Sequence, residues 1–163
     1  MRVVGIDPGS LVTGFGIVER DTHSLRALTW GAVRTNARQP LPMRLKCIYD
    51  GLSEVLHTWQ PDAVAVERVF FADNAKTALI LGHARGVALL SVAHATLPLA
   101  EYSALEIKLA VVGYGRAAKA QVQQMVRVLL GLSAAPHPPD AADALAAAIC
   151  HLHTHRVQRE GVR

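Results

Sequence analysis

Four acidic residues stand where their carboxylates could act together. Asp7 and Glu67 each end a short apolar run, and Asp140 and Asp143 lie three residues apart. Hard oxygen ligands without a cysteine or histidine partner favour Mg²⁺ or Mn²⁺ over zinc. Two such ions roughly 4 Å apart can activate a water and stabilise the leaving oxygen of a phosphodiester. If the four acids converge, they predict metal-dependent hydrolysis of nucleic acid.

Each acid also has a simpler explanation. Asp7 precedes Pro8 and Gly9, a position where aspartate commonly accepts backbone N–H bonds from a turn. Asp140 and Asp143 fit the first turn of a helix, where the positive end of the helix favours acids of any function. Convergence distinguishes the two interpretations, since four neighbouring carboxylates repel one another unless a proton or a cation is bound.

The acids require a sheet that brings their segments together. Residues 3–10 and 12–18 predict a hairpin with a carboxylate at the end of its first strand. By strict alternation Asp7 shares a face with Gly5, so that face has bare backbone which another group can approach closely. Residues 24–35 predict a third strand, which completes an antiparallel meander.

The remainder of the chain alternates helices with strands. Residues 41–59 have apolar positions at threes and fours, which predicts an amphipathic helix lying on the sheet. Residues 62–67 form an apolar run too short for a helix, and we expect a central parallel strand. The order predicts an α/β fold with a five-stranded mixed sheet, three antiparallel strands followed by two parallel ones, flanked by helices. Further elements are expected at 75–96 (helix, capped by Asn74), 97–102 (strand), 103–112, 118–130 and 140–155 (helices).

The predicted helix over 75–96 is apolar nearly all round, and Gly82 and Gly86 lie one turn apart on it. Such a helix is buried on more than one side, and its small residues permit close approach of another element. Either the core or a subunit interface could supply this second cover.

Length and composition restrict the class of protein. With 163 residues, 51% of them hydrophobic, we expect a single domain over 1–155 and a short basic tail over 156–163. Cys47 and Cys150 have no ligand-type spacing, which suits a reducing, cytoplasmic location. Because the chain enters a strand at once, we expect no signal peptide. The apolar stretch 86–93 is too short to span a bilayer, so we expect no membrane association.

The net charge of +4 combines 17 Lys and Arg with 13 Asp and Glu. If the four acids are held in one metal site, nine acids remain, and the rest of the molecule carries 17 − 9 = +8. An excess of this size suits a polyanionic partner, nucleic acid first. Many mildly basic proteins bind no nucleic acid, so charge alone adds only modest support.

Six segments carry a family pattern, in order and over nearly the whole chain: residues 5–10, 67–70, 74–75, 81–86, 111–115 and 140–146. Together they resemble the RuvC family of Holliday-junction resolvases. The resemblance implies a ribonuclease H-like fold, two Mg²⁺ ions per active site, with Mn²⁺ as the alternative, and a homodimer that makes paired symmetric nicks in four-way junction DNA during recombination and repair. It also implies a RuvA-RuvB branch-migration complex as partner.

The resemblance also implies roles for particular residues. Asp7, Glu67, Asp140 and Asp143 would be the metal-binding catalytic acids, and the helix from Ala75 would form much of the dimer interface. Phe70 matches an aromatic that stacks on a base near the crossover, whereas two adjacent loop phenylalanines could also fill a core. The expected DNA-binding set is Phe70, Phe71, Arg68, Lys76, Lys108, Arg116 and Lys119, with Lys108 and Lys119 near the scissile phosphate.

Some features depart from the family or leave alternatives open. Arg68 stands where the family often has glutamine, and some members have histidine at the position of Asp143. Lys108 and Lys119 could also belong to a solvated helix face. His151, His153 and His155 alternate near a helix end, where they favour the helix dipole, and at this spacing they face different ways.

Three other functions compete with junction resolution. The segment 5–9 followed by Thr13 and Gly14 also resembles the phosphate-binding hairpin of actin-like and sugar-kinase ATPases. Those proteins need two duplicated lobes, and ATP binding would leave Asp140 and Asp143 unexplained. A related nuclease that trims ribosomal RNA tends to be shorter and lacks Phe70 and the long helix. An architectural junction binder that has lost cleavage predicts a missing acid, and all four acids are present.

Overall fold

The computed structural model describes residues 1–22, 24–68 and 74–160, with side chains through His155. Its five-stranded sheet has the order β3-β2-β1-β4-β5. β1, β2 and β3 pair antiparallel, while β4 is parallel to both β1 and β5, so the predicted mixed sheet is confirmed. The strands are β1 (Arg2–Asp7), β2 (Val12–Arg20), β3 (Leu25–Arg34), β4 (Ala63–Glu67) and β5 (Leu99–Tyr102).

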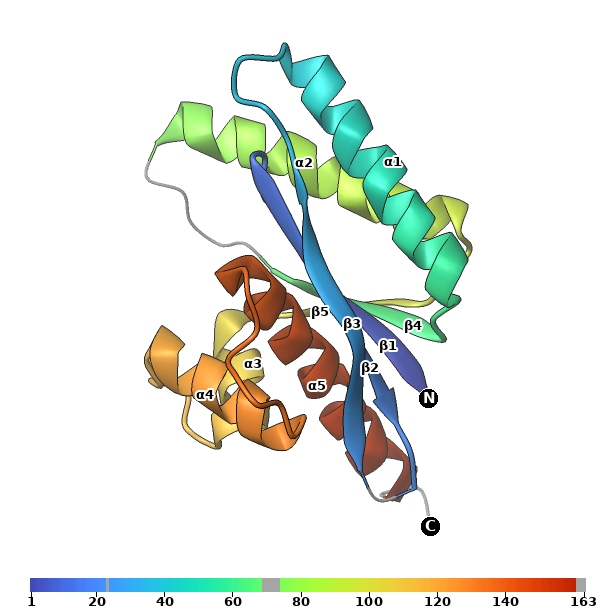
Figure 1. Ribbon diagram of the computed structural model, residues 1–163, viewed down its shortest axis with the longest axis vertical. Helices are drawn as coiled ribbons and strands as arrows, with labels where there is room; N and C mark the ends of the chain where they lie inside the picture. Colours follow the sequence, from blue (N-terminus) through green and yellow to red (C-terminus); the bar gives the residue numbers. More distant parts are fainter. Residues whose placement is uncertain (23, 69–73, 161–163) are drawn as a thin grey trace.

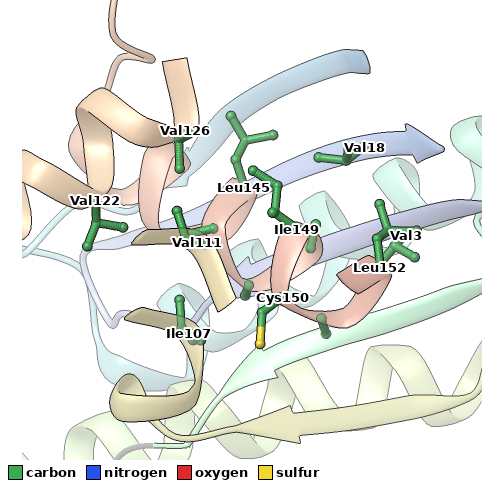
Figure 2. Close-up of a cluster of buried hydrophobic side chains, with 14 of the residues drawn as sticks. Val3, Val18, Ile107, Val111, Val122, Val126, Leu145, Ile149, Cys150 and Leu152 are labelled. Atoms are coloured by element: carbon green, nitrogen blue, oxygen red, sulfur yellow. The ribbon is translucent and has the colours of Figure 1, made fainter. Parts of the chain in front are cut away.

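Helices cover both faces of the sheet (Figure 1). One face packs against α1 and α2 through the β1 residues Val4 and Ile6. The other face packs against α3, α4 and α5 through Val3 and its neighbours, and Figure 2 shows Ile149 and Leu152 of α5 within this second core. The helices are α1 (Leu41–Trp59), α2 (Ala75–His94), α3 (Ala104–Val112), α4 (Lys119–Leu129) and α5 (Pro139–Glu160).

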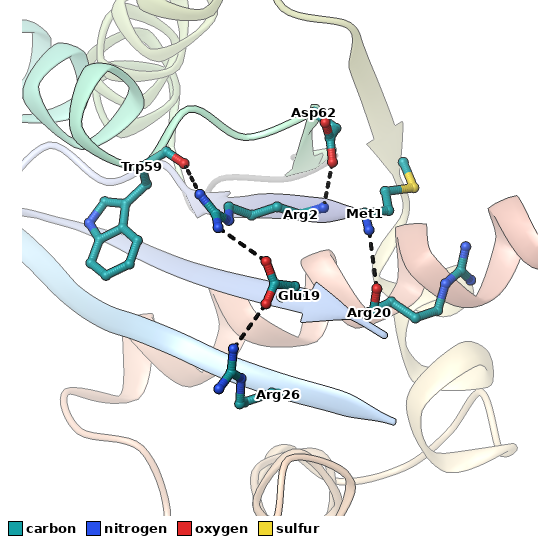
Figure 3. A network of polar contacts seen from close by, with 7 residues as sticks. All are labelled: Met1, Arg2, Glu19, Arg20, Arg26, Trp59 and Asp62. Carbon is teal, nitrogen blue, oxygen red and sulfur yellow. Dashed lines mark hydrogen bonds and ion pairs between the residues drawn. The ribbon is translucent and has the colours of Figure 1, made fainter. Parts of the chain in front are cut away.

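A polar network fixes the sheet where β1 begins (Figure 3). The backbone N–H of Arg2 donates to Asp62 Oδ2 at 2.6 Å, and its guanidinium donates to the carbonyl of Trp59 at 2.6 Å. The same guanidinium pairs with Glu19, which also pairs with Arg26. The network joins β1 to β2, β3 and the α1–β4 connection, at the opposite end of β1 from Asp7.

Two helix starts agree with the sequence, and one helix end does not. The Asn74 side chain accepts from Thr77 N–H, and Ser103 forms a capping box with Glu106, as S-x-x-E at a helix start predicts. α5 runs to Glu160 instead of ending near His155. Residues 156–160 contain no proline or glycine, so the local sequence supplies no stop signal.

α2 is, among the described residues, the one helix long and apolar enough to cross a membrane by length and composition alone, and 22% of that window is buried inside the molecule. This differs from the expectation that no stretch is long enough, because the apolar character continues over the whole helix. α2 packs against α1 through Ala84 and Ala88, and its Arg85 pairs with Glu101 of β5. These contacts are those of a helix packed on the sheet.

Candidate active site

Glycines on β1 and β2, which have no side chains, allow the backbone of α5 to lie close against the sheet. A Cβ added to Gly5 would be 1.7 Å from the carbonyl oxygen of Ala144, and one added to Gly14 would be 2.1 Å from that of Asp140. Gly5 therefore accommodates a helix backbone, which is the close approach that its bare face predicts. The contact at Gly14 places the first turn of α5 over the hairpin that carries Asp7.

The four predicted acids meet at one edge of the sheet. Asp7 ends β1 and Glu67 ends the adjacent parallel strand β4, where Ile6 pairs with Val66. Parallel strands end at the same edge, which places the two carboxylates together. Asp140 and Asp143 reach this edge from the start of α5, so the site assembles segments that are distant in sequence.

Asp7 lies at the electrostatic centre of the cluster. Burial raises its pKa from 3.8 to about 7, with further contributions from the charges of Asp143, Glu67 and Asp140, and Lys119 opposes them. At a pKa of about 7 the carboxyl of Asp7 is partly protonated near neutral pH, and a bound positive charge would favour its ionised form. The charges of all three other acids raise the pKa of Asp7.

Two lysines partly neutralise the site. Lys119 Nζ lies 2.5 Å from Asp143 Oδ2, and this contact raises the pKa of Lys119. Burial and the charge of Asp143 raise the pKa of Glu67, whereas Lys119 and Lys108 lower it. Glu67, Asp143 and both lysines line a cavity of about 260 Å³. The cavity combines acidic groups that could hold cations with basic groups that could hold a phosphate.

The donor chemistry fits hard divalent cations, but the side chains are not arranged as a finished coordination shell. Among the described residues, no group of three or more His, Cys, Asp or Glu side chains is placed to hold a metal ion. Asp143 is instead paired with Lys119. Four carboxylates with a raised pKa at their centre nevertheless favour the arrival of positive charge.

The predicted DNA-binding residues separate into groups. Lys108 and Lys119 line the cavity. Arg68 follows Glu67 directly, and its guanidinium pairs with Glu106 at 2.7 Å, so the charge that it adds beside the site is partly balanced. Lys76, at the start of α2, and Arg116, before α4, are exposed and do not line this cavity. Phe70 and Phe71 lie outside the described residues.

Other predicted features have clear positions. Cys150 is buried, which raises the pKa of its thiol to about 11, and Cys47 is a free, partly buried thiol. His151 Nδ1 lies 2.8 Å from the Tyr102 hydroxyl, and His153 Nδ1 lies 2.9 Å from the carbonyl oxygen of Ala110. These histidines therefore make separate contacts with β5 and α3.

Arg85 of α2 contacts the site, and no role was predicted for this side chain from the sequence. Its guanidinium donates to the backbone carbonyl of Glu67 at 2.6 Å. In the sequence Arg85 is an arginine on a predominantly apolar helix, within the segment 81–86. Such a position predicts a buried partner but does not identify it.

A mixed sheet of this order, with acids at the edge shared by β1 and β4 and at the start of α5, defines a ribonuclease H-like nuclease. The fold agrees with that of the yeast mitochondrial Holliday junction resolvase Ydc2, with a TM-score of 0.72 at 14% identity over 97% of this chain and 80% of that one. At this identity the similarity concerns the fold alone.

Similarity in sequence is far more specific. The model of the family described as crossover junction endodeoxyribonuclease RuvC matches residues 3–151. Relatives of that name from Syntrophotalea carbinolica and Desulforamulus reducens are 58% and 50% identical, covering 94% and 93% of both chains. Thermus thermophilus RuvC in complex with a Holliday junction substrate has a TM-score of 0.92 at 39% identity over 97% of this chain and 96% of that one. The chain belongs to the RuvC family of crossover junction endodeoxyribonucleases, which are metal-dependent nucleases.

Proposed function

We propose that this protein resolves four-way DNA junctions by paired symmetric nicks in recombination and repair. The observation that carries the proposal is its similarity, along 97% of the chain, to a relative solved with a Holliday junction substrate. The cluster of Asp7, Glu67, Asp140 and Asp143 beside two lysines supports the same chemistry. ATP binding would leave this cluster without a role, and an architectural binder would not need it.

The four acids would hold two Mg²⁺ ions, with Mn²⁺ as the alternative. Bound divalent ions supply Lewis acidity and lower the pKa of a coordinated water. Asp7, whose pKa is raised by the charges of the other three acids, would be shared between the two ions. Glu67 and Asp143 would each contribute to one or the other, and Asp140 would complete the set and help to position water.

The lysines would bind the phosphate that is cut. Lys119 balances Asp143 in the free protein, and Lys108 lines the same cavity. A phosphodiester that entered the cavity would offer Lys119 a second anionic partner, and bound cations would balance the charge of the acids. We therefore expect the lysines to orient the phosphate for attack by water on phosphorus, with the P–O bond of the leaving strand breaking.

We infer a homodimer formed through α2. Leu79, Gly82, Gly86 and Leu90 recur at threes and fours and share one helix face. Leu79 is 65% exposed and Leu90 is 48% exposed, and a Cβ on either glycine would meet nothing within 4 Å. An uncovered apolar face with small residues suits close packing against the same helix of a second subunit. Two sites in such a dimer would account for paired nicks.

Partner and location follow from the same proposal. Junction resolution implies that a RuvA-RuvB branch-migration complex supplies the substrate, and we propose this partner on family grounds. A cytoplasmic location agrees with the free thiols of Cys47 and Cys150.

The test compares a synthetic four-way junction with a linear duplex of the same sequence, each incubated with Mg²⁺, Mn²⁺ or EDTA. We expect paired, symmetric nicks on the junction alone, lost in EDTA. Junction binding without nicks under every metal, tried over several junction sequences, would contradict the proposal and favour an architectural role.

A further inference from the structure

Arg85 connects the helix proposed for dimerisation to the strand that carries Glu67. On α2, Arg85 lies at the border between the exposed side of the helix and the buried side, which contains Ala84 and Ala88. Its side chain is 17% exposed. An arginine so far withdrawn from water requires partners for its donors.

Those partners are the ends of two neighbouring strands. Arg85 Nη1 donates to the carbonyl oxygen of Glu67, the last residue of β4, at 2.6 Å. Nη2 pairs with Glu101 Oε1 of β5 at 2.5 Å. Glu101 lies opposite Val66 in the β4–β5 register, so a single planar guanidinium spans both strands beside the site.

Glu67 needs such support because of where it lies. The β1–β4 pairing ends with Ile6 opposite Val66, so Glu67 is one residue beyond the last pair with β1. Its carboxylate is partly buried and faces the like charge of Asp143. On the other side, the N–H of Arg68 donates to the carbonyl oxygen of Tyr102 at 2.7 Å. Arg85 contacts the main chain of Glu67, so it supports position and leaves the carboxylate available.

We propose that Arg85 is a positioning residue, which fixes the Glu67 end of β4 to α2 and to Glu101 so that the Glu67 carboxylate is held in the catalytic cluster. The inference rests on the proposed function, since it assumes that Glu67 serves junction cleavage. A displacement of about 1 Å at a catalytic group can lower a rate about 10²-fold.

The test measures single-turnover junction cleavage by the full-length protein as a function of Mg²⁺ concentration. Arg85→Met is expected to cut about 10–100-fold more slowly and to need more Mg²⁺ for half-maximal rate, with junction affinity in EDTA and oligomeric state unchanged. Glu101→Gln keeps an acceptor for Arg85, so its cleavage rate is expected to fall less than that of Arg85→Met. Arg85→Lys keeps the charge but not the two-pronged geometry, so it is expected to be intermediate. Arg26→Met is the matched control, because Arg26 is 72% exposed and pairs with Glu19.

A double variant separates positioning from general stability. If Arg85 and Glu101 act as one unit, Arg85→Met with Glu101→Gln is no slower than Arg85→Met alone. A wild-type rate and Mg²⁺ dependence in Arg85→Met would overturn the inference, as would equal losses of cleavage and junction affinity. Should Arg85→Met fail to fold, wild-type behaviour of both Arg85→Lys and Glu101→Gln would overturn it. Absence of cleavage by the wild-type protein would overturn the proposed function together with this inference, whereas normal cleavage by all variants overturns the inference alone.

Discussion

Asp7 is expected to destabilise the metal-free protein at neutral pH. Its pKa in the folded protein is about 7, against an ordinary value of 3.8. As pH rises above 3.8, the unfolded chain releases this proton while the folded protein retains it, so the free energy of unfolding falls until about pH 7 and then levels. An asparagine at this position would resemble the protonated carboxyl and would not titrate, so Asp7→Asn removes this dependence.

The magnitude follows from the two pKa values. A change from 3.8 to about 7, at about 1.36 kcal/mol per pKa unit, gives about 4 kcal/mol. This value is an upper limit, because Asp7 is partly exposed and solvent screens its charge. By the same linkage, the free energy of unfolding of Asp7→Asn exceeds that of the wild type by about 2 kcal/mol more at about pH 8 than at about pH 5.5.

The assay is urea unfolding of wild-type and Asp7→Asn proteins in EDTA at both pH values, repeated with Mg²⁺ at the higher one. We expect the variant to be more stable in EDTA, and the gap to narrow when Mg²⁺ stabilises the wild-type protein. Asp50→Asn is the control, because Asp50 is exposed and pairs with Lys46. An Asp7→Asn protein no more stable than wild type at the higher pH in EDTA, or a gap that does not change with pH, would refute the reasoning.

Three further predictions concern helix packing, base stacking and dimerisation. Gly5→Ala would place a Cβ 1.7 Å from an α5 carbonyl oxygen. Thermal unfolding should therefore show a loss of about 1–3 kcal/mol or more in the free energy of unfolding, and cleavage should fall sharply. Gly31→Ala is the control and should be tolerated, because its Cβ would meet only side-chain atoms of Phe15, at 3.1 Å or more. Phe70→Ala should reduce junction distortion, followed by fluorescence, and cutting more than duplex binding; equal losses would indicate a core role. Gly82→Glu should yield monomers in sedimentation, whereas Val128→Glu should not, because Val128 of α4 is 58% exposed and lies away from α2 in the sequence. A dimeric Gly82→Glu protein would argue against α2 as the interface.

The sheet could be predicted because each strand carries its own local signal. Short β-branched runs bounded by turn residues indicated β1 and β4, and the apolar periodicity of 41–59 indicated α1. The alternation that places Gly5 and Asp7 on one face also holds. No local pattern indicated that α5 packs against Gly5, because the contact with Ala144 joins segments that are far apart in the sequence.

The site could be predicted in composition but not in its electrostatic state. Residue types and positions indicated the four acids, and the raised pKa of Asp7 depends on burial and on three neighbours that only folding supplies. The pairing of Lys119 with Asp143 was equally inaccessible, since a lysine at a helix start has many possible partners. The contact of Arg85 could not be predicted for the same reason, because one of its acceptors is a backbone carbonyl, which has no sequence signature.

The most direct measurement of the central claim is cleavage and binding of one four-way junction by wild-type and Asp7→Asn proteins, side by side in Mg²⁺. The acid cluster predicts that the variant binds the junction as tightly as the wild type and cuts neither pair of strands, because Asp7 is the acid that all the others surround. Full cleavage by Asp7→Asn would contradict the assignment of the active site.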